Sequence, residues 1–305
     1  MDKAIENFGG IVVNTNACWA VAQNLSRHTV GFVDLQRPLE RMASGVLITV
    51  GGHLFVATAA HAISFQPGEQ VSFVLPYPKG VSGALPILRR GKIESEWPDV
   101  GFLELDPEGA LPALRKSAID LHRIGPLGPG DPNRPCFLFN YCSDKRRPKR
   151  GSTSEPHLTF RPMCYSHAPL NPDNSPSVSS ADPPFDKSVD IFLPYNRWET
   201  TWYCEEHEGN VHGPEPRWAN GGGLWQGFGD EGKFGRAENV RLFGIQSRCS
   251  RKSKYMRACQ IIHWLHLLHE QYSDLRPALV AAFPQLAQDL PIANPDALPR
   301  LNHDA

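Results

Sequence analysis

Three short segments, far apart in the chain, carry the residue types of an acyl-transfer site. Thr58-Ala59-Ala60-His61 places an imidazole directly after an apolar run, and Pro98-Asp99 precedes the run Val100-Gly101-Phe102-Leu103. The third segment, Trp218-Ala219-Asn220-Gly221-Gly222-Gly223, is a glycine-rich turn. An imidazole can move protons near neutral pH, and a carboxylate can fix its tautomer. These residue types could support general-base chemistry, with an imidazole as the base and a carboxylate as its partner.

The elements that would position these groups read mostly as short strands. Two β-rich runs flank Gly51-Gly52, whose glycines supply the positive φ angles of a tight hairpin. We expect further strands at 100–105, 135–141, 157–161, 190–193 and 240–245. Helical periodicity appears late, over 256–268, and we expect a shorter helix at 275–286. Many strands with a terminal helix indicate an all-β protein.

Composition limits the classes of function. The 305 residues have a formal net charge of -1, which argues against a polybasic nucleic-acid binder and against attraction to anionic membranes. No run of apolar residues is long enough to span a membrane, and residues 1–7 do not have the pattern of a signal peptide. The seven cysteines are odd in number, so we expect reduced thiols and a cytoplasmic protein.

Taken together in this order, the three segments resemble trypsin-like serine proteases of the chymotrypsin fold. The third segment is most similar to that of cytosolic bacterial members, in which the motif reads Gly-x-Ser-Gly-Gly-Gly-Leu-Trp. The resemblance covers about residues 40 to 270. The resemblance implies two six-stranded antiparallel barrels with the site between them and a C-terminal helix packed on the second barrel. It also implies that His61, Asp99 and position 220 form the catalytic set.

The sequence departs from this family at the glycine-rich turn. Asn220 stands at the nucleophile position, and a carboxamide cannot replace the serine hydroxyl. Removing such a nucleophile costs on the order of a million-fold in turnover. A second departure is Trp218, where the family has a glycine whose N–H, with that of residue 220, forms the oxyanion hole. Two changes in one turn indicate loss of catalysis.

Peptide binding does not need the nucleophile. The run Gly244-Ile245-Gln246-Ser247-Arg248 resembles the strand that pairs with substrate backbone in the family, so Gln246, Ser247 and Arg248 are candidate substrate-binding residues. We expect a peptide or protein ligand, with a protein assembly as a further possible partner, and no cofactor or metal. Cys204, His207 and His212 could offer three metal ligands, but the spacing has no fourth partner.

Four divisions of the chain follow from these observations. We expect an N-terminal extension over 1–27, a first barrel over 28–128 with His61 and Asp99, and a second barrel over 129–252 with the Asn220 turn. The C-terminal helices and tail occupy 253–305.

Three functional hypotheses remain open at this point. The first is a catalytically impaired protease-like protein that binds peptide between its barrels. The second is an active serine endopeptidase, in which another hydroxyl acts or position 220 is an engineered or unusual variant. The third is a structural partner whose cleft is filled by its own loops. Simpler interpretations also exist, because His61 could be a buried core histidine, Asp99 a turn residue, and Asn220-Gly221 a plain hairpin turn.

Overall fold

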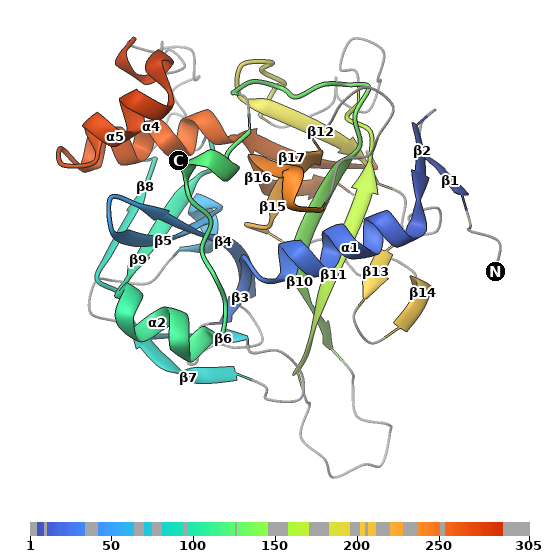
Figure 1. Cartoon of the computed structure of the whole chain (residues 1–305), viewed down its shortest axis with the longest axis horizontal. Helices are drawn as coiled ribbons and strands as arrows, with labels where there is room; N and C mark the ends of the chain where they lie inside the picture. Colours follow the sequence, from blue (N-terminus) through green and yellow to red (C-terminus); the bar gives the residue numbers. More distant parts are fainter. Residues whose placement is uncertain are drawn as a thin grey trace, which may run out of the picture.

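The computed structural model places two curled antiparallel sheets side by side (Figure 1). The structure describes residues 5–8, 11–33, 42–63, 70–74, 81–93, 97–125, 127–145, 158–170, 183–195, 202–204, 207–211, 220–227, 237–250 and 254–288. Among these residues, no helix has the length and apolar character needed to cross a membrane. The expected two-sheet architecture of the chymotrypsin type is confirmed.

The first sheet contains seven strands in the order β7-β6-β3-β4-β5-β9-β8. Their bounds are β3 (Thr29–Val33), β4 (Met42–Val50), β5 (His53–Thr58), β6 (Gln70–Val74), β7 (Val81–Pro86), β8 (Arg89–Lys92) and β9 (Gly101–Leu105). The β4–β5 hairpin turns at Gly51 and Gly52, with φ of 57° and 89°, as the sequence predicts. Helix α2 (Pro107–Leu114) follows β9 and starts at the capping carboxylate of Asp106.

The second sheet contains eight strands in the order β12-β17-β16-β15-β10-β11-β13-β14. Their bounds are β10 (Cys136–Lys145), β11 (Leu158–His167), β12 (Asp190–Pro194), β13 (Trp202–Cys204), β14 (His207–Val211), β15 (Gly223–Gly227), β16 (Val240–Ser250) and β17 (Tyr255–Gln260). Six of these strands match the expected barrel, and the hairpin β13–β14 extends it at one edge.

Strand alternation divides the apolar side chains between separate cores. Along β5, Leu54 and Val56 face the interior of the first sheet, whereas Phe55 and Ala57 face a core shared with the rest of the molecule. The second sheet has its own interior, which includes Met256 of β17. Because β5 is buried on both faces, the sequence shows a continuous apolar run there.

The prediction of a helix over 256–268 is wrong in its first half. Residues 255–260 form β17, and α4 starts only at Ile261 and runs to Gln271. The apolar residues Met256 and Ala258 alternate, and the chain between them pairs with both β12 and β16. These long-range pairings override the local 3.6-residue pattern. The second predicted helix is present as α5 (Arg276–Ala282) followed by a 3-10 turn.

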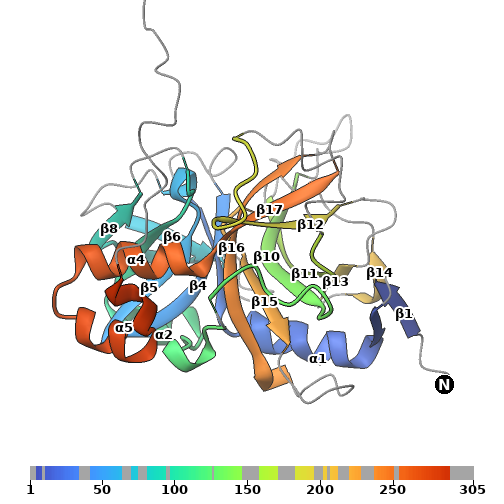
Figure 2. The ribbon, with the colours of Figure 1, turned by 90° about the horizontal axis from the view of Figure 1, so that it is seen from above.

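Helix α4 packs on both halves of the molecule, whereas the resemblance placed it on the second barrel alone. It contacts β16 and β17 and also β8 of the first sheet, and Trp264 meets Phe55 edge to face with ring centroids 6.1 Å apart. Figure 2 shows α4 and α5 beside the first sheet and α1 along the second. Helix α1 (Thr15–Ser26) and the preceding hairpin of β1 (Ile5–Phe8) and β2 (Ile11–Asn14) were not predicted.

Candidate active site

His61 and Asp99 lie together because their strands are neighbours. β5 ends at Thr58 and β9 begins at Gly101, and these two residues face each other across the antiparallel pair. His61 follows β5 in a single 3-10 turn, and Asp99 lies two residues before the start of β9. The end of one strand and the beginning of the other therefore deliver the imidazole and the carboxylate to the same edge of the first sheet.

The Asp99 carboxylate holds His61 at two points. Its Oδ2 lies 2.6 Å from Nδ1 of the imidazole, and its Oδ1 accepts the backbone N–H of His61 at 3.0 Å. Asp99 is buried, whereas 46% of the His61 side chain is exposed. An Nδ1–H that donates to Asp99 leaves the lone pair of Nε2 available on the outer side of the ring.

The side chain of Asn220 occupies the position opposite that lone pair. Its Nδ2 lies 2.7 Å from Nε2 of His61, and its Oδ1 lies 3.4 Å from Nε2 of Gln246. The two contacts agree on the orientation of the amide, because the Gln246 amide nitrogen donates to the oxygen and leaves the Asn220 nitrogen to donate to His61. A continuous chain of hydrogen bonds thus runs from Gln246 through Asn220 and His61 to Asp99.

Backbone contacts from both sheets fix the turn that carries Asn220. The N–H of Ser44 on β4 donates to the carbonyl oxygen of Asn220 at 2.8 Å. The N–H of Gly221 donates to the carbonyl of Gln246, and the N–H of Gln246 donates to that of Gly222, each at 2.8 Å. Gly221 has φ of 88°, and a Cβ there would lie 2.1 Å from the Ser44 oxygen and from Oγ1 of Thr58. Only glycine fits at position 221, where the turn packs against the first sheet.

The nearby hydroxyl groups are engaged elsewhere. Thr58 donates to the carbonyl of Ser44 at 2.7 Å, Ser44 bonds the backbone of Tyr141, and Ser247 donates to the carbonyl of Arg257 at 3.2 Å. Within the described part of the chain, no hydroxyl is hydrogen-bonded to His61. An imidazole held by a carboxylate in this way can act as a base, and the group hydrogen-bonded to its outer nitrogen is an amide rather than a hydroxyl.

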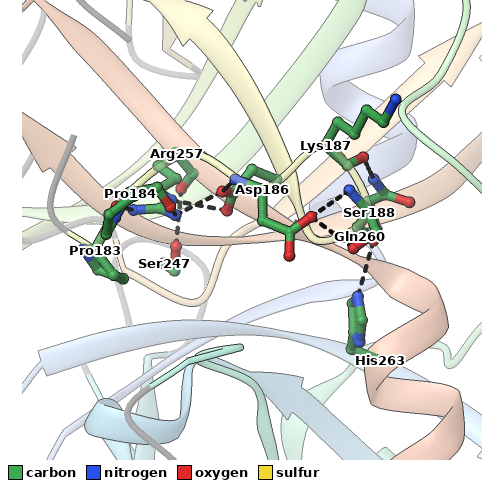
Figure 3. Close-up of polar contacts among 10 residues, drawn as sticks. Pro183, Pro184, Asp186, Lys187, Ser188, Ser247, Arg257, Gln260 and His263 are labelled. Carbon is green, nitrogen blue, oxygen red and sulfur yellow. Dashed lines mark hydrogen bonds and ion pairs between the residues drawn. The ribbon is translucent and has the colours of Figure 1, made fainter. Parts of the chain in front are cut away.

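A buried guanidinium supports the segment that carries Asp99. Arg257 on β17 lies 3.8 Å from the ring centre of Trp97, two residues before Asp99, and its side chain is fully buried. Its Nε and Nη2 bond the two carboxylate oxygens of Asp190 at 2.8 and 2.5 Å. Figure 3 shows the guanidinium also reaching the carbonyls of Pro183 and Pro184. Burial raises the pKa of Asp190, and the hydrogen bonds from Arg257 oppose this shift.

The structure describes three of the four other predicted site residues. Gln246 contacts Asn220 directly, Ser247 lies at a bulge in the β16–β17 pairing, and the guanidinium of Arg248 lies 5.6 Å from the ring centre of Trp97. Trp218 lies outside the described residues, so its predicted place in an oxyanion hole stays a prediction. The sequence analysis missed Ser44, because a role played by a backbone N–H leaves no mark on residue type.

The structure does not test Cys204, His207 and His212 as a set of metal ligands. Cys204 and His207 face each other across the β13–β14 hairpin, and His212 lies outside the described residues. Among the described residues, no group of three His, Cys, Asp or Glu side chains has the arrangement of a metal site.

Comparison with known proteins supports the fold alone. No protein-family profile and no curated protein sequence matches the chain. An inactivated protease paralogue of the scabies mite, S-D1, matches with a TM-score of 0.52 at 11% identity over 83% of this chain and 94% of its own. Two further protease structures match with lower TM-scores. The thermostable serine protease AL20 from an extremophilic microorganism matches with a TM-score of 0.42 at 15% identity over 78% and 91% of the two chains. The protease Anisep from Arthrobacter nicotinovorans matches with a TM-score of 0.44 at 14% identity over 81% and 96%.

Proposed function

We propose that this protein has lost peptide-bond hydrolysis and binds an extended peptide beside the His61–Asp99 pair. One observation carries the proposal: the amide of Asn220 lies 2.7 Å from the imidazole nitrogen that would activate a hydroxyl. Because the amide fills that place, His61 has no hydroxyl to deprotonate there, and hydrolysis of a bound peptide lacks its first step. The likeness to an inactivated protease paralogue agrees with this proposal.

The strand β16 offers a place for such a peptide. Its pairing with β15 ends at Ile245, whereas its pairing with β17 continues to Ser250. Among the described strands, none pairs with residues 247–250 on the side opposite β17. A strand edge that no described strand covers can accept an extended chain by strand addition, in which backbone hydrogen bonds supply affinity. Arg248 is half-buried on this edge and would favour acidic side chains in the ligand.

A fluorophosphonate probe tests the state of the site. We expect the natural chain and Asn220→Ala to remain unlabelled, because neither has a hydroxyl beside His61. We expect Asn220→Ser to be labelled, and the double variant His61→Ala with Asn220→Ser to lose that labelling. Labelling of the natural chain that disappears in His61→Ala would show an active serine hydrolase and contradict the proposal.

Peptide binding is tested separately with a mixed peptide library and the full chain. We expect retained peptides to be recovered uncleaved, and Arg248→Glu to shift the retained set away from acidic sequences. The matched control is Arg241→Glu, which reverses an exposed charge on β16 at a position where the strand is paired with β15. Failure to retain any peptide, or recovery of cleaved products that depend on His61, would count against peptide binding without hydrolysis.

A further inference from the structure

Two atoms of Asn220 have partners that favour a reaction within the residue itself. The side-chain Nδ2 lies 2.7 Å from Nε2 of His61, which is backed by Asp99. The backbone carbonyl oxygen accepts the N–H of Ser44 at 2.8 Å. An amide nitrogen is a weak nucleophile until a base removes a proton from it, and a fixed N–H donor stabilises negative charge that develops on a carbonyl oxygen.

We infer that Asn220 can cleave its own peptide bond to Gly221 by cyclisation, with His61 as the general base and the Ser44 N–H as the oxyanion donor. This activity goes beyond the proposed peptide binding, because its substrate is the chain itself. The chain contains only one Asn-Gly pair, at 220–221.

The reaction needs no other reactant. Nδ2 of Asn220 attacks the backbone carbonyl carbon of the same residue and closes a five-membered ring, while its proton moves to Nε2 of His61. The tetrahedral intermediate carries its negative charge on the oxygen that Ser44 holds. The bond from this carbon to the nitrogen of Gly221 then breaks, its electron pair stays on that nitrogen, and His61 returns the proton there. The products are residues 1–220 ending in a succinimide and residues 221–305 beginning with a free amine.

The same contacts disfavour the usual side reaction of an Asn-Gly pair. In deamidation, the nitrogen of the following residue attacks the side-chain carbonyl and ammonia leaves. Here the N–H of Gly221 is bound to the carbonyl of Gln246 at 2.8 Å, and Gly221 is wedged against Ser44 and Thr58. The amide nitrogen of Gln246, 3.4 Å from Oδ1, would stabilise the charge that Oδ1 gains as Nδ2 loses its proton. The fold therefore directs reactivity towards Nδ2.

The two products would remain associated in the folded protein. β15 starts at Gly223, just after the broken bond, and it is paired with β10 on one side and β16 on the other. Cleavage is therefore visible only after the chain is unfolded for analysis.

The test is an intact-mass time course of the purified full chain at neutral pH, analysed under denaturing conditions. We expect two fragments that join at 220–221, with the first lighter by one water than the corresponding free acid. We expect His61→Gln to slow their appearance about a hundredfold. Asn220→Gln keeps an amide but requires a six-membered ring, and we expect it to be slower as well. His53→Gln, which changes a histidine elsewhere on the first sheet, is the matched control and should cleave at the natural rate.

The same chain in denaturant gives a second measurement that does not depend on variants folding. Once unfolded, Gly221 is released from Gln246, and we expect deamidation of Asn220 to replace cleavage. The inference is overturned if the folded chain stays intact, if His61→Gln produces the fragments at the natural rate, or if the folded chain deamidates instead. It is also overturned if the first fragment ends in a free acid from the start, because that product indicates a contaminating peptidase.

Discussion

At the scale of single residues, Gly221 belongs both to the candidate site and to the contact between the two sheets. Its backbone has φ of 88°, and the space where a Cβ would stand is occupied by atoms of Ser44 and Thr58. These two residues belong to the first sheet, whereas Gly221 leads into the second. A side chain here would therefore separate the Asn220 turn from β4 and move the amide away from His61.

We expect Gly221→Ala to lower the free energy of unfolding by about 3 kcal/mol, from the strained φ and the overlap together. Gly52→Ala is the matched control, because Gly52 has nearly the same φ, 89°, and nothing within 4 Å of the added Cβ. It should cost only about 1 kcal/mol. Urea unfolding measures both. Equal costs for the two variants would show that the tight contact with the first sheet is unimportant.

At the scale of elements, Arg257 joins β17, β12 and the segment before β9. Its guanidinium contacts Trp97 and pairs with Asp190, and both charged side chains are fully buried. The backbone carbonyls of Pro183 and Pro184 accept hydrogen bonds from its Nη1 and Nη2. A single side chain thus fixes the loop before β12 and supports the residues that lead to Asp99.

We expect Arg257→Met to destabilise the fold by about 3–5 kcal/mol, because it leaves the Asp190 carboxylate buried without its partner. The double variant Arg257→Met with Asp190→Leu removes both charges and should recover part of that loss. Arg248→Met, which removes a half-buried guanidinium near the same Trp97 ring, should cost less than about 1 kcal/mol. Urea unfolding of the three variants measures this, and a double variant as unstable as the single one would contradict the ion-pair explanation.

At the scale of the whole molecule, a polar cluster attaches the C-terminal segment to the first sheet. Glu104 of β9 lies 2.6 Å from Nδ1 of His53 and accepts the hydroxyl of Tyr272 at 2.6 Å. Asp274 lies 3.1 Å from the other ring nitrogen of His53. The hydrogen bond to Glu104 is the largest cause that raises the pKa of His53 above its ordinary 6.5. Protonated His53 therefore strengthens the contact between residues 272–274 and the sheet.

The sign of the resulting pH dependence follows from the raised pKa. The stabilisation by His53 is fully present below pH 6.5 and is lost as the pH rises through the higher pKa of the folded state. We expect the difference in unfolding free energy between the natural chain and His53→Gln to be largest at acidic pH and to shrink above pH 6.5. Urea unfolding at several pH values measures this difference. A difference that is constant with pH, or that grows towards alkaline pH, would contradict the assignment.

The sequence alone predicted the fold type and the meeting of His61, Asp99 and Asn220. The Gly51-Gly52 hairpin and the apolar runs predicted strands. The resemblance of the three ordered motifs to trypsin-like serine proteases implied the two-barrel fold and the meeting of the three residues. Local periodicity failed at 256–260, where β17 pairs with strands that lie far away in the sequence. Only the tertiary structure decided the direction of the Asn220 amide, the Ser44 N–H on its carbonyl and the burial of Arg257. Each of these depends on contacts between distant segments, and such contacts leave no periodic pattern in the residues themselves.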